Sequence, residues 1–191
     1  VHALLGENGA GKSTLMKILT GIYQADAGEI LFNGRETKIT SVLDARALGI
    51  TMIHQELNLL SNLTIAQNIF IGKEIKHHGV FLDERATSAK AAELLERVNL
   101  HVGPNTMVSE LTVAQQQMVE IARALTLNAK LIIMDEPSAA LSDSEVESLH
   151  RVVRELKGRG VSIIYVTHRL HEVFQLCDQF TVFQDGRFTG N

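Results

Sequence analysis

A glycine-rich stretch near the start of the chain has the residue types and spacing of a phosphate-binding loop. Gly6–Ser13, GENGAGKS, matches the pattern G-x-x-x-x-G-K-[ST] and lies between a predicted strand and a predicted helix. Glycines permit positive φ angles, so successive backbone N–H groups can converge on a β-phosphate, and the helix N-terminus adds the positive end of its dipole. Lys12 can reach the β- and γ-phosphates, and the Ser13 hydroxyl can bind Mg²⁺. The predicted site comprises Gly6, Glu7, Asn8, Gly9, Ala10, Gly11, Lys12, Ser13 and Thr14.

Two carboxylates follow an apolar run in the second half of the chain. The run LIIM ends in Asp135 and Glu136, which predicts a carboxylate at the carboxyl edge of the sheet, where ligands of open α/β folds bind. We expect Asp135 to hold the water shell of Mg²⁺ and Glu136 to polarise an attacking water. The alternative is a polar loop that caps a helix, and the phosphate loop makes the catalytic interpretation the better one.

Three further polar features lie at the ends of predicted elements. Gln55 follows the apolar segment ITMI, and His168 follows IIYV. A helix is predicted over 112–125, where Thr112 and Gln115 have the spacing of a capping box and apolar residues recur on one face. A single histidine after a strand is more often structural than catalytic, so none of these features is decisive by itself.

Taken in chain order, the segments resemble the motifs of ATP-binding cassette (ABC) ATPases. GENGAGKST, HQE, LTVAQQQ, LIIMDEP and VTH are similar to the Walker A, Q-loop, signature, Walker B and switch-histidine motifs of that family. The longer segments HALLGENGAGKSTLMKILTGIYQADAGEI and LTIAQNIF resemble the first nucleotide-binding domain of monosaccharide importers of the ribose, galactose, arabinose and xylose type. The resemblance implies a P-loop NTPase fold of the ABC ATPase type that hydrolyses Mg-ATP.

The resemblance also implies roles for the polar residues. Ser13, Gln55 and Asp135 would serve the metal, Glu136 would act on water, and His168 would contact the γ-phosphate. In this family the signature segment points across a dimer interface at the γ-phosphate held by the partner's Walker A loop. The nucleotide-binding residues carried over from the signature are Thr112, Val113, Ala114 and Gln115.

The signature departs from the common family pattern Leu-Ser-Gly-Gly-Gln, because this chain has LTVAQ. Thr112 keeps the hydroxyl, whereas Ala114 adds a Cβ where the backbone should approach the phosphate. We interpret this as a tuned site. Ser142 stands where many ABC proteins carry the aspartate of the D-loop, and the aromatic residue that stacks on adenine in this family would lie upstream of Val1.

The elements that must position these residues alternate along the chain, which predicts an α/β fold with a mostly parallel core sheet. The dipeptide Asn33-Gly34 predicts a small antiparallel hairpin within 28–37. We expect one nucleotide-binding domain over 1–191, with a helical subdomain at about 58–128. Because Val1 already begins a strand pattern, we expect a fragment that lacks its N-terminal strands. Strands are predicted at 1–5, 49–55, 130–137 and 161–168, with a last strand and a turn over 179–188. Helices are predicted from Lys12 to Gly21, over 64–101, over 112–125 and from Ser142, and the spacings of Thr64 with Gln67 and of Ser142 with Glu145 also predict capping boxes.

Composition limits the function classes. The 191 residues carry a net charge of −4, which argues against a strongly DNA-seeking protein. The single cysteine, Cys177, excludes an internal disulfide framework and is predicted to be a core or half-buried thiol. No apolar run approaches the roughly 20 residues that span a bilayer.

Three alternatives compete with the importer interpretation. A soluble ABC ATPase of DNA repair, chromosome structure or translation is disfavoured because the segment between Gln55 and Leu111 is too short for a long coiled-coil insertion. A GTPase or kinase would need a guanine-reading motif or a lid, and the chain has no such motif. An inert binding module is disfavoured because Lys12, Asp135, Glu136 and His168 are all present.

The expected function is therefore ATP hydrolysis that drives uptake of a monosaccharide, with ATP and Mg²⁺ bound. The expected partners are transmembrane sugar permease subunits, a second ATP-binding cassette in the same chain or in a dimer, and indirectly an extracytoplasmic sugar-binding protein. No nucleic-acid partner is expected. The expected location is the cytoplasmic face of the inner membrane, as a peripheral subunit. The sugar is chosen by the permease and the binding protein, so this sequence does not name it.

Overall fold

The computed structural model describes residues 1–55, 57–77 and 81–191 and divides into two compact units. The first unit contains Val1–Met52, Ala129–Glu136 and Gly160–Asn191, and the second contains Ile53–Asn128 and Pro137–Arg159. Residues 58–128, for which the sequence predicts a helical subdomain, fall within the range of the second unit. Glu56, in the HQE segment, and residues 78–80, in the predicted helical stretch 64–101, lie outside the described residues.

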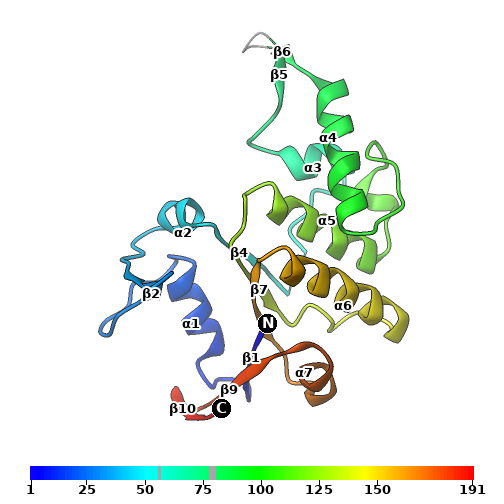
Figure 1. Ribbon diagram of the computed structural model, residues 1–191. Helices are drawn as coiled ribbons and strands as arrows, with labels where there is room; N and C mark the ends of the chain where they lie inside the picture. The colour runs from blue at the N-terminus through cyan, green and yellow to red at the C-terminus, as the bar shows by residue number, and fades with distance from the viewer. Residues whose placement is uncertain (56, 78–80) are drawn as a thin grey trace. The chain divides into compact units, whose positions relative to one another are not determined.

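The first unit is organised by a sheet with the strand order β10-β9-β1-β8-β7-β4 (Figure 1). β1 runs parallel to both β8 and β9, and β7 runs parallel to β8, whereas β10 pairs with β9 in the antiparallel direction at one end of the sheet. The mostly parallel α/β sheet predicted from the sequence is confirmed. The strands are β1 (His2–Gly6), β4 (Ile50–Ile53), β7 (Leu131–Asp135), β8 (Ser162–Val166), β9 (Gln179–Gln184) and β10 (Arg187–Gly190).

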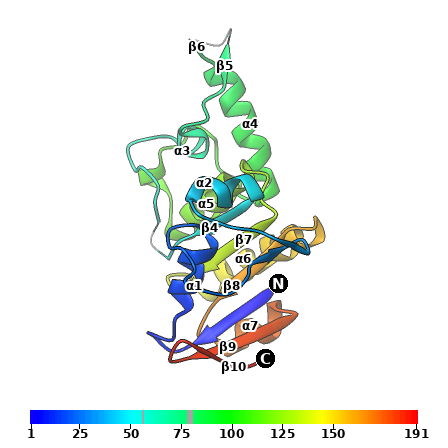
Figure 2. The same ribbon diagram turned by 90° about the vertical axis from the view of Figure 1, so that its left-hand side faces the viewer.

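Buried side chains line both faces of this sheet, because successive residues of a strand point to opposite faces. Leu4 of β1 packs with Met16 of α1 (Lys12–Leu19) in one buried cluster, to which Ala45 of α2 (Val42–Leu48) also belongs. Ala3 packs on the other side with Val173 of α7 (Leu170–Leu176). Helices on both faces explain why the core strands are continuous apolar runs. Figure 2 shows β1, β9 and α7 together near the two termini.

Two local signals at the start of the chain are confirmed. α1 ends before Gly21, whose φ of +75° takes the chain out of the helix; a Cβ there would lie 2.2 Å from the Ser41 carbonyl oxygen. The dipeptide Asn33-Gly34, with φ of 52° and 73°, joins β2 (Leu31–Phe32) to β3 (Arg35–Glu36) in the predicted antiparallel hairpin.

The second unit is mostly helical, and α3, α4 and α5 pack against one another. The prediction of a helical stretch over 64–101 is wrong in its middle. α3 ends at Phe70, where the chain turns through Gly72 with φ of +71°, and a short antiparallel pair of strands precedes α4. The elements are α3 (Ile65–Phe70), β5 (Lys76–His77), β6 (Phe81–Leu82), α4 (Glu84–Arg97), the 3₁₀ helix η1 (Val108–Glu110), α5 (Val113–Leu125) and α6 (Asp143–Gly158).

Three helices of this unit begin with the capping boxes that the sequence predicts. In each, the backbone N–H of the N-cap residue donates to a side-chain oxygen three residues later, at 2.9 Å. The pairs are Thr64–Gln67, Thr112–Gln115 and Ser142–Glu145. Among the described residues, none of the helices is both long enough and apolar enough to cross a membrane.

Candidate functional site

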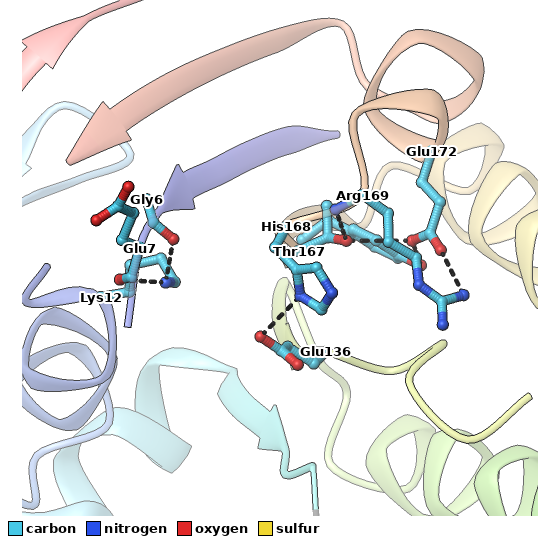
Figure 3. Close-up of polar contacts among 9 residues, drawn as sticks. Gly6, Glu7, Lys12, Glu136, Thr167, His168, Arg169 and Glu172 are labelled. Atoms are coloured by element: carbon cyan, nitrogen blue, oxygen red, sulfur yellow. Dashed lines mark hydrogen bonds and ion pairs between the residues drawn. The ribbon is translucent and has the colours of Figure 1, made fainter. Parts of the chain in front are cut away.

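The glycine-rich loop joins β1 to α1 and holds a buried cation. Lys12, the first residue of α1, is 8% exposed, and its ammonium donates to the Gly6 carbonyl oxygen at 2.6 Å and to the Glu7 carbonyl oxygen at 3.1 Å (Figure 3). The two carbonyls replace part of the hydration that a buried ammonium loses. The loop therefore keeps a positive charge fixed beside its own backbone.

The N–H groups at the start of α1 are available to a ligand. Gly11, the N-cap residue, has φ of +97°, and no side chain caps the helix. Within residues 1–55, 57–77 and 81–191, no backbone acceptor is recorded for the N–H groups of Lys12, Ser13 and Thr14. Ser13 and Thr14 are exposed. Uncapped N–H groups, the positive helix end and a fixed ammonium together form a site that fits a phosphate group.

The turn between β9 and β10 contacts the backbone of the glycine-rich loop. The Gly186 N–H donates to the Ala10 carbonyl oxygen at 3.1 Å, and a Cβ on Gly6 would lie 2.4 Å from the Phe183 carbonyl oxygen. Sequence analysis predicted a last strand and a turn here, and missed both β10 and this contact. The signal was the dipeptide Asp185-Gly186, a hairpin turn like Asn33-Gly34.

Glu136 and His168 come together at the ends of two neighbouring strands. Asp135 pairs with Val166 in the β7–β8 register, and the Glu136 N–H donates to the Val166 carbonyl oxygen at 3.0 Å. Glu136 Oε1 lies 3.2 Å from His168 Nδ1 (Figure 3). The Glu136 side chain is 20% exposed and that of His168 is 63% exposed. The pair is thus preformed and open to a ligand.

The backbone of Glu136 is strained. Its φ of +45° lies in the left-handed region, which a non-glycine residue adopts at a cost of about 1–3 kcal/mol. The conformation turns the chain directly after β7, so that Glu136 leaves the strand while its N–H stays bonded to β8. Strain of this kind is concentrated at functional sites. Here the strained residue is the one whose side chain contacts His168.

The phosphate loop and these two side chains emerge from one edge of the sheet. In the order β1-β8-β7, Leu4 pairs with Val166, and Val166 pairs with Asp135. The three strands are parallel, so the loops that follow them leave at the carboxyl edge, where ligands of open α/β sheets bind. The structure therefore brings the predicted residues of the first unit, including partly buried Asp135, to a common edge.

A buried polar group next to His168 was missed by sequence analysis. Glu172 of α7 is fully buried and accepts a hydrogen bond from the Tyr165 hydroxyl at 2.9 Å. Thr167 and Arg169 also contact the Glu172 carboxylate. The only sequence signal was an acidic residue four positions after His168, because the contacts depend on how α7 packs on the sheet.

Gln55 and Thr112–Gln115 belong to the second unit, whereas the phosphate loop belongs to the first. Gln55 is exposed two residues after β4. Of the three consecutive glutamines, Gln115 completes the capping box and Gln116 donates to the Leu111 carbonyl oxygen at 3.1 Å, while Gln117 is buried. Two of the three side chains therefore order the start of α5, and Val113 stays exposed there.

An ion pair between buried Glu120 and partly exposed Arg123 attaches Asn58 to α5. The Asn58 N–H donates to Glu120 Oε1 at 3.0 Å, and the Arg123 guanidinium donates to the Asn58 carbonyl oxygen at 3.1 Å. Glu120 and Arg123 also form an ion pair with each other. The segment that follows Gln55 is therefore attached to the helix whose N-terminus carries the predicted signature.

Cys177 is not a candidate nucleophile. Burial raises the pKa of its thiol to about 11, so the thiol stays protonated at neutral pH. Cys177 packs beside the buried cluster that contains Val173. It is half-buried, as the sequence analysis predicted.

A cavity of about 620 Å³ lies within the second unit and contains none of the predicted ATP-site residues. Its apolar lining comes from α3, the residues around it and β6, with Phe70, Ile71 and Leu82 among the contributors. Ile71 and Leu82 are exposed, as is Phe81 beside them.

Comparisons with known proteins agree with this arrangement. The ABC transporter family model matches residues 1–139. The chain is 53% identical over 189 residues to putative ribose/galactose/methyl galactoside import ATP-binding protein 2 of Burkholderia cenocepacia (strain HI2424), and 52% identical over 190 residues to the protein of the same name from Agrobacterium fabrum. These matches cover 98% and 100% of this chain, which spans 37% of the length of each relative.

Two solved structures have the same fold. One is a nucleotide-free ATP-binding cassette from an ABC transporter, with a TM-score of 0.87 and 28% identity. The other is an ATP-binding cassette of an ABC transporter in its ADP conformation, with a TM-score of 0.86 and 30% identity. Each comparison covers all of this chain, and covers 79% and 78% of the other chain, respectively.

Replacing Lys12 tests the phosphate loop. We expect Lys12→Ala to weaken the binding of a fluorescent ATP analogue at least about 100-fold, because hydrogen bonds from a charged group contribute about 1.5–3 kcal/mol each. The control is Lys17→Ala, on the same helix, whose ammonium lies 5.1 Å from the centre of the Tyr23 ring. Circular dichroism should show both variants folded. Unchanged affinity in Lys12→Ala, or an equal loss in Lys17→Ala, would refute the assignment.

Proposed function

The chain belongs to the ABC transporter family, and we propose that it is an ATP-hydrolysing domain that powers the import of a monosaccharide through a membrane permease. The observation that carries the proposal is the contact of Glu136 with His168 at the sheet edge from which the phosphate loop also emerges. An open carboxylate–imidazole pair beside a phosphate site suits the attack of water on a phosphoryl group. The two import proteins named above support a sugar as the transported substrate.

The phosphates of ATP would be bound by the loop and its lysine. Lys12 would exchange one or both carbonyl contacts for phosphate oxygens, and the N–H groups at the start of α1 would donate to the β-phosphate. Ser13, Asp135 and Gln55 would hold Mg²⁺, since hydroxyl, carboxylate and amide oxygens are the hard ligands that it prefers. Bound Mg²⁺ would neutralise charge on the phosphates.

Glu136 and His168 would act on the γ-phosphate and the attacking water. Glu136 would accept the hydrogen bond that orients the water, and His168 would donate to a γ-phosphate oxygen. Their mutual contact of 3.2 Å orients both groups before the substrate arrives. In such a preorganised site little reorganisation remains for the chemical step.

The start of α5 would act in trans on ATP held by a second cassette, in the same polypeptide or in a dimer. Thr112, Val113, Ala114 and Gln115 form an ordered helix N-terminus with a capping box, and an anion is favourable at such an end. The Ala114 Cβ would keep the backbone slightly farther from the phosphate than glycine would.

The proposed partners follow from membership of the family and from the surface of the second unit. A permease must supply the transmembrane passage, and a sugar-binding protein outside the membrane would deliver the sugar. The surface that we propose for permease contact is formed by exposed Ile71 and Leu82, which line the second unit's cavity, and by exposed Phe81, which precedes Leu82 in β6. The domain would then be peripheral, at the cytoplasmic face of the inner membrane. A soluble ABC ATPase of DNA repair or translation is not favoured, because the relatives are named as import proteins.

Replacing Glu136 separates hydrolysis from binding. We expect Glu136→Gln to bind ATP normally and to hydrolyse it about 10²–10⁴-fold more slowly, which is the range for loss of a positioned base and corresponds to about 3–5 kcal/mol of barrier. Steady-state phosphate release measures the rate. Glu147→Gln, at an exposed position on α6, is the matched control. Wild-type turnover in Glu136→Gln would show that this cassette is not the hydrolytic one.

Mixing two inactive variants tests action in trans. Lys12→Ala lacks the phosphate loop's cation, and Ala114→Glu places a negative charge where the signature meets the γ-phosphate. Each variant alone should be nearly inactive. A mixture should recover activity, because one of the two mixed sites has both parts intact. The wild-type rate should also rise more than linearly with protein concentration. No recovery on mixing, with a strictly proportional wild-type rate, would contradict action in trans.

A further inference from the structure

We propose that buried Glu172 is a positioning residue for His168, and that it acts by fixing the backbone on both sides of the histidine. The inference rests on the proposed function, since it concerns how the γ-phosphate-contacting histidine is held. Glu172 lies four residues after His168, on α7, and its carboxylate contacts Tyr165, Thr167 and Arg169 (Figure 3).

His168 is far more exposed than the residues that surround it. Glu172 is 0% exposed and Thr167 is 2% exposed, whereas His168 between Thr167 and Arg169 is 63% exposed. An exposed imidazole on a free loop would sample many positions. Its placement against Glu136 must therefore come from the backbone that carries it.

Hydrogen bonds connect the residues on the two sides of His168 to each other and to Glu172. The Thr167 hydroxyl accepts from the Arg169 N–H at 3.0 Å and donates to Glu172 Oε2 at 3.4 Å. The Glu172 N–H donates to the Arg169 carbonyl oxygen at 3.1 Å. Both neighbours of His168 are thus bonded to the buried Glu172 side chain, which restrains the turn from β8 into α7.

A hydroxyl group on β8 also binds the Glu172 carboxylate. The Tyr165 hydroxyl, which is also buried, donates to Glu172 Oε2 at 2.9 Å. Tyr165 pairs with Met134 in the β7–β8 register, one position before the pairing of Val166 with Asp135. Through Tyr165, Glu172 therefore connects the turn that carries His168 to β8, the strand that pairs with β7 immediately before Glu136.

Burial of the Glu172 carboxylate costs free energy, which its hydrogen-bond partners offset. A carboxylate buried among apolar groups is unfavourable unless donors and a cation compensate it. Arg169 Nη1 lies 3.5 Å from Glu172 Oε1, and the hydroxyls of Tyr165 and Thr167 supply donors. An apolar residue could fill the same volume without this network. The network specifies one conformation of the turn, which a hydrophobic contact would not.

A double-mutant cycle on the catalytic rate tests the inference in the purified chain. We expect His168→Ala to lower kcat about 100-fold and Glu172→Ala to lower it about 10-fold with little change in KM, since a small misplacement of a reacting group is costly. In the His168→Ala background, Glu172→Ala should change kcat less than about 2-fold. Glu172→Gln, which keeps an acceptor oxygen, should recover most of the rate. If the decrease in kcat of the double variant equals the product of the decreases in the two single variants, the inference is overturned.

A second measurement keeps the test independent of activity and of folding. The Cε1–H resonance of His168 reports its contact with Glu136, so Glu136→Gln and Glu172→Ala should shift it in the same direction at one fixed pH. His171, an exposed residue of α7, is the internal reference and should not move. Val173→Ala removes a neighbouring buried side chain of α7 and should leave the His168 resonance in place. Tyr165→Phe replaces Glu172→Ala if that variant does not fold.

The outcomes separate the two proposals. If the wild-type chain hydrolyses no ATP at any concentration, the proposed function fails, and the resonance of His168 still decides the role of Glu172. If the chain is active but Val173→Ala moves the His168 resonance as much as Glu172→Ala does, Glu172 is only part of the core and the inference fails.

Discussion

The parallel register of β1, β8 and β7 is the constraint on which the rest of the first unit depends. Leu4, Val166 and Asp135 are aligned across the three strands, so the chain leaves all three at one edge of the sheet. Lys12, Glu136 and His168 follow from that edge, although they are far apart in the sequence. Packing on both faces maintains the register, through Met16 and Ile133 on one side and Val173 on the other.

The site departs from ordinary folding preferences at three residues. Lys12 and Glu172 carry charge in buried positions, and Glu136 has a left-handed backbone. Each departure is compensated locally: carbonyls bind the lysine, hydroxyls and an arginine bind Glu172, and the Val166 carbonyl holds the Glu136 N–H. Natural proteins break local rules mainly at functional sites, where the surrounding fold stabilises them. All three lie in the segments that follow β1, β7 and β8 at one edge of the sheet, which is a physical reason to place the chemistry there.

Local chemistry made much of this fold predictable from the sequence. Continuous apolar runs gave the core strands, Asn33-Gly34 gave the hairpin, and the polar pairs at Thr64, Thr112 and Ser142 gave three helix starts. The helix break after Phe70 was missed because the prediction joined the helix start at Thr64 to the helical run from Asp83, whereas Gly72 turns the backbone between them. The role of Glu172 was missed because its partners come from β8 and meet it only after α7 packs. The spacing of the motifs predicted the loop residues of the candidate site. It did not predict the contacts that hold them, which are those of Gly186 with Ala10 and of Glu172 with Tyr165 and Thr167.

The most direct test of the account is a calorimetric titration of the chain with ATP, ADP and AMP in the presence of Mg²⁺. The central claim is that the loop between β1 and α1 binds the β-phosphate, through the Lys12 ammonium and the uncapped N–H groups of α1. ATP and ADP should therefore bind with affinities within about 10-fold of each other, and AMP should bind at least about 100-fold more weakly. Binding of AMP as tight as that of ATP would contradict the claim.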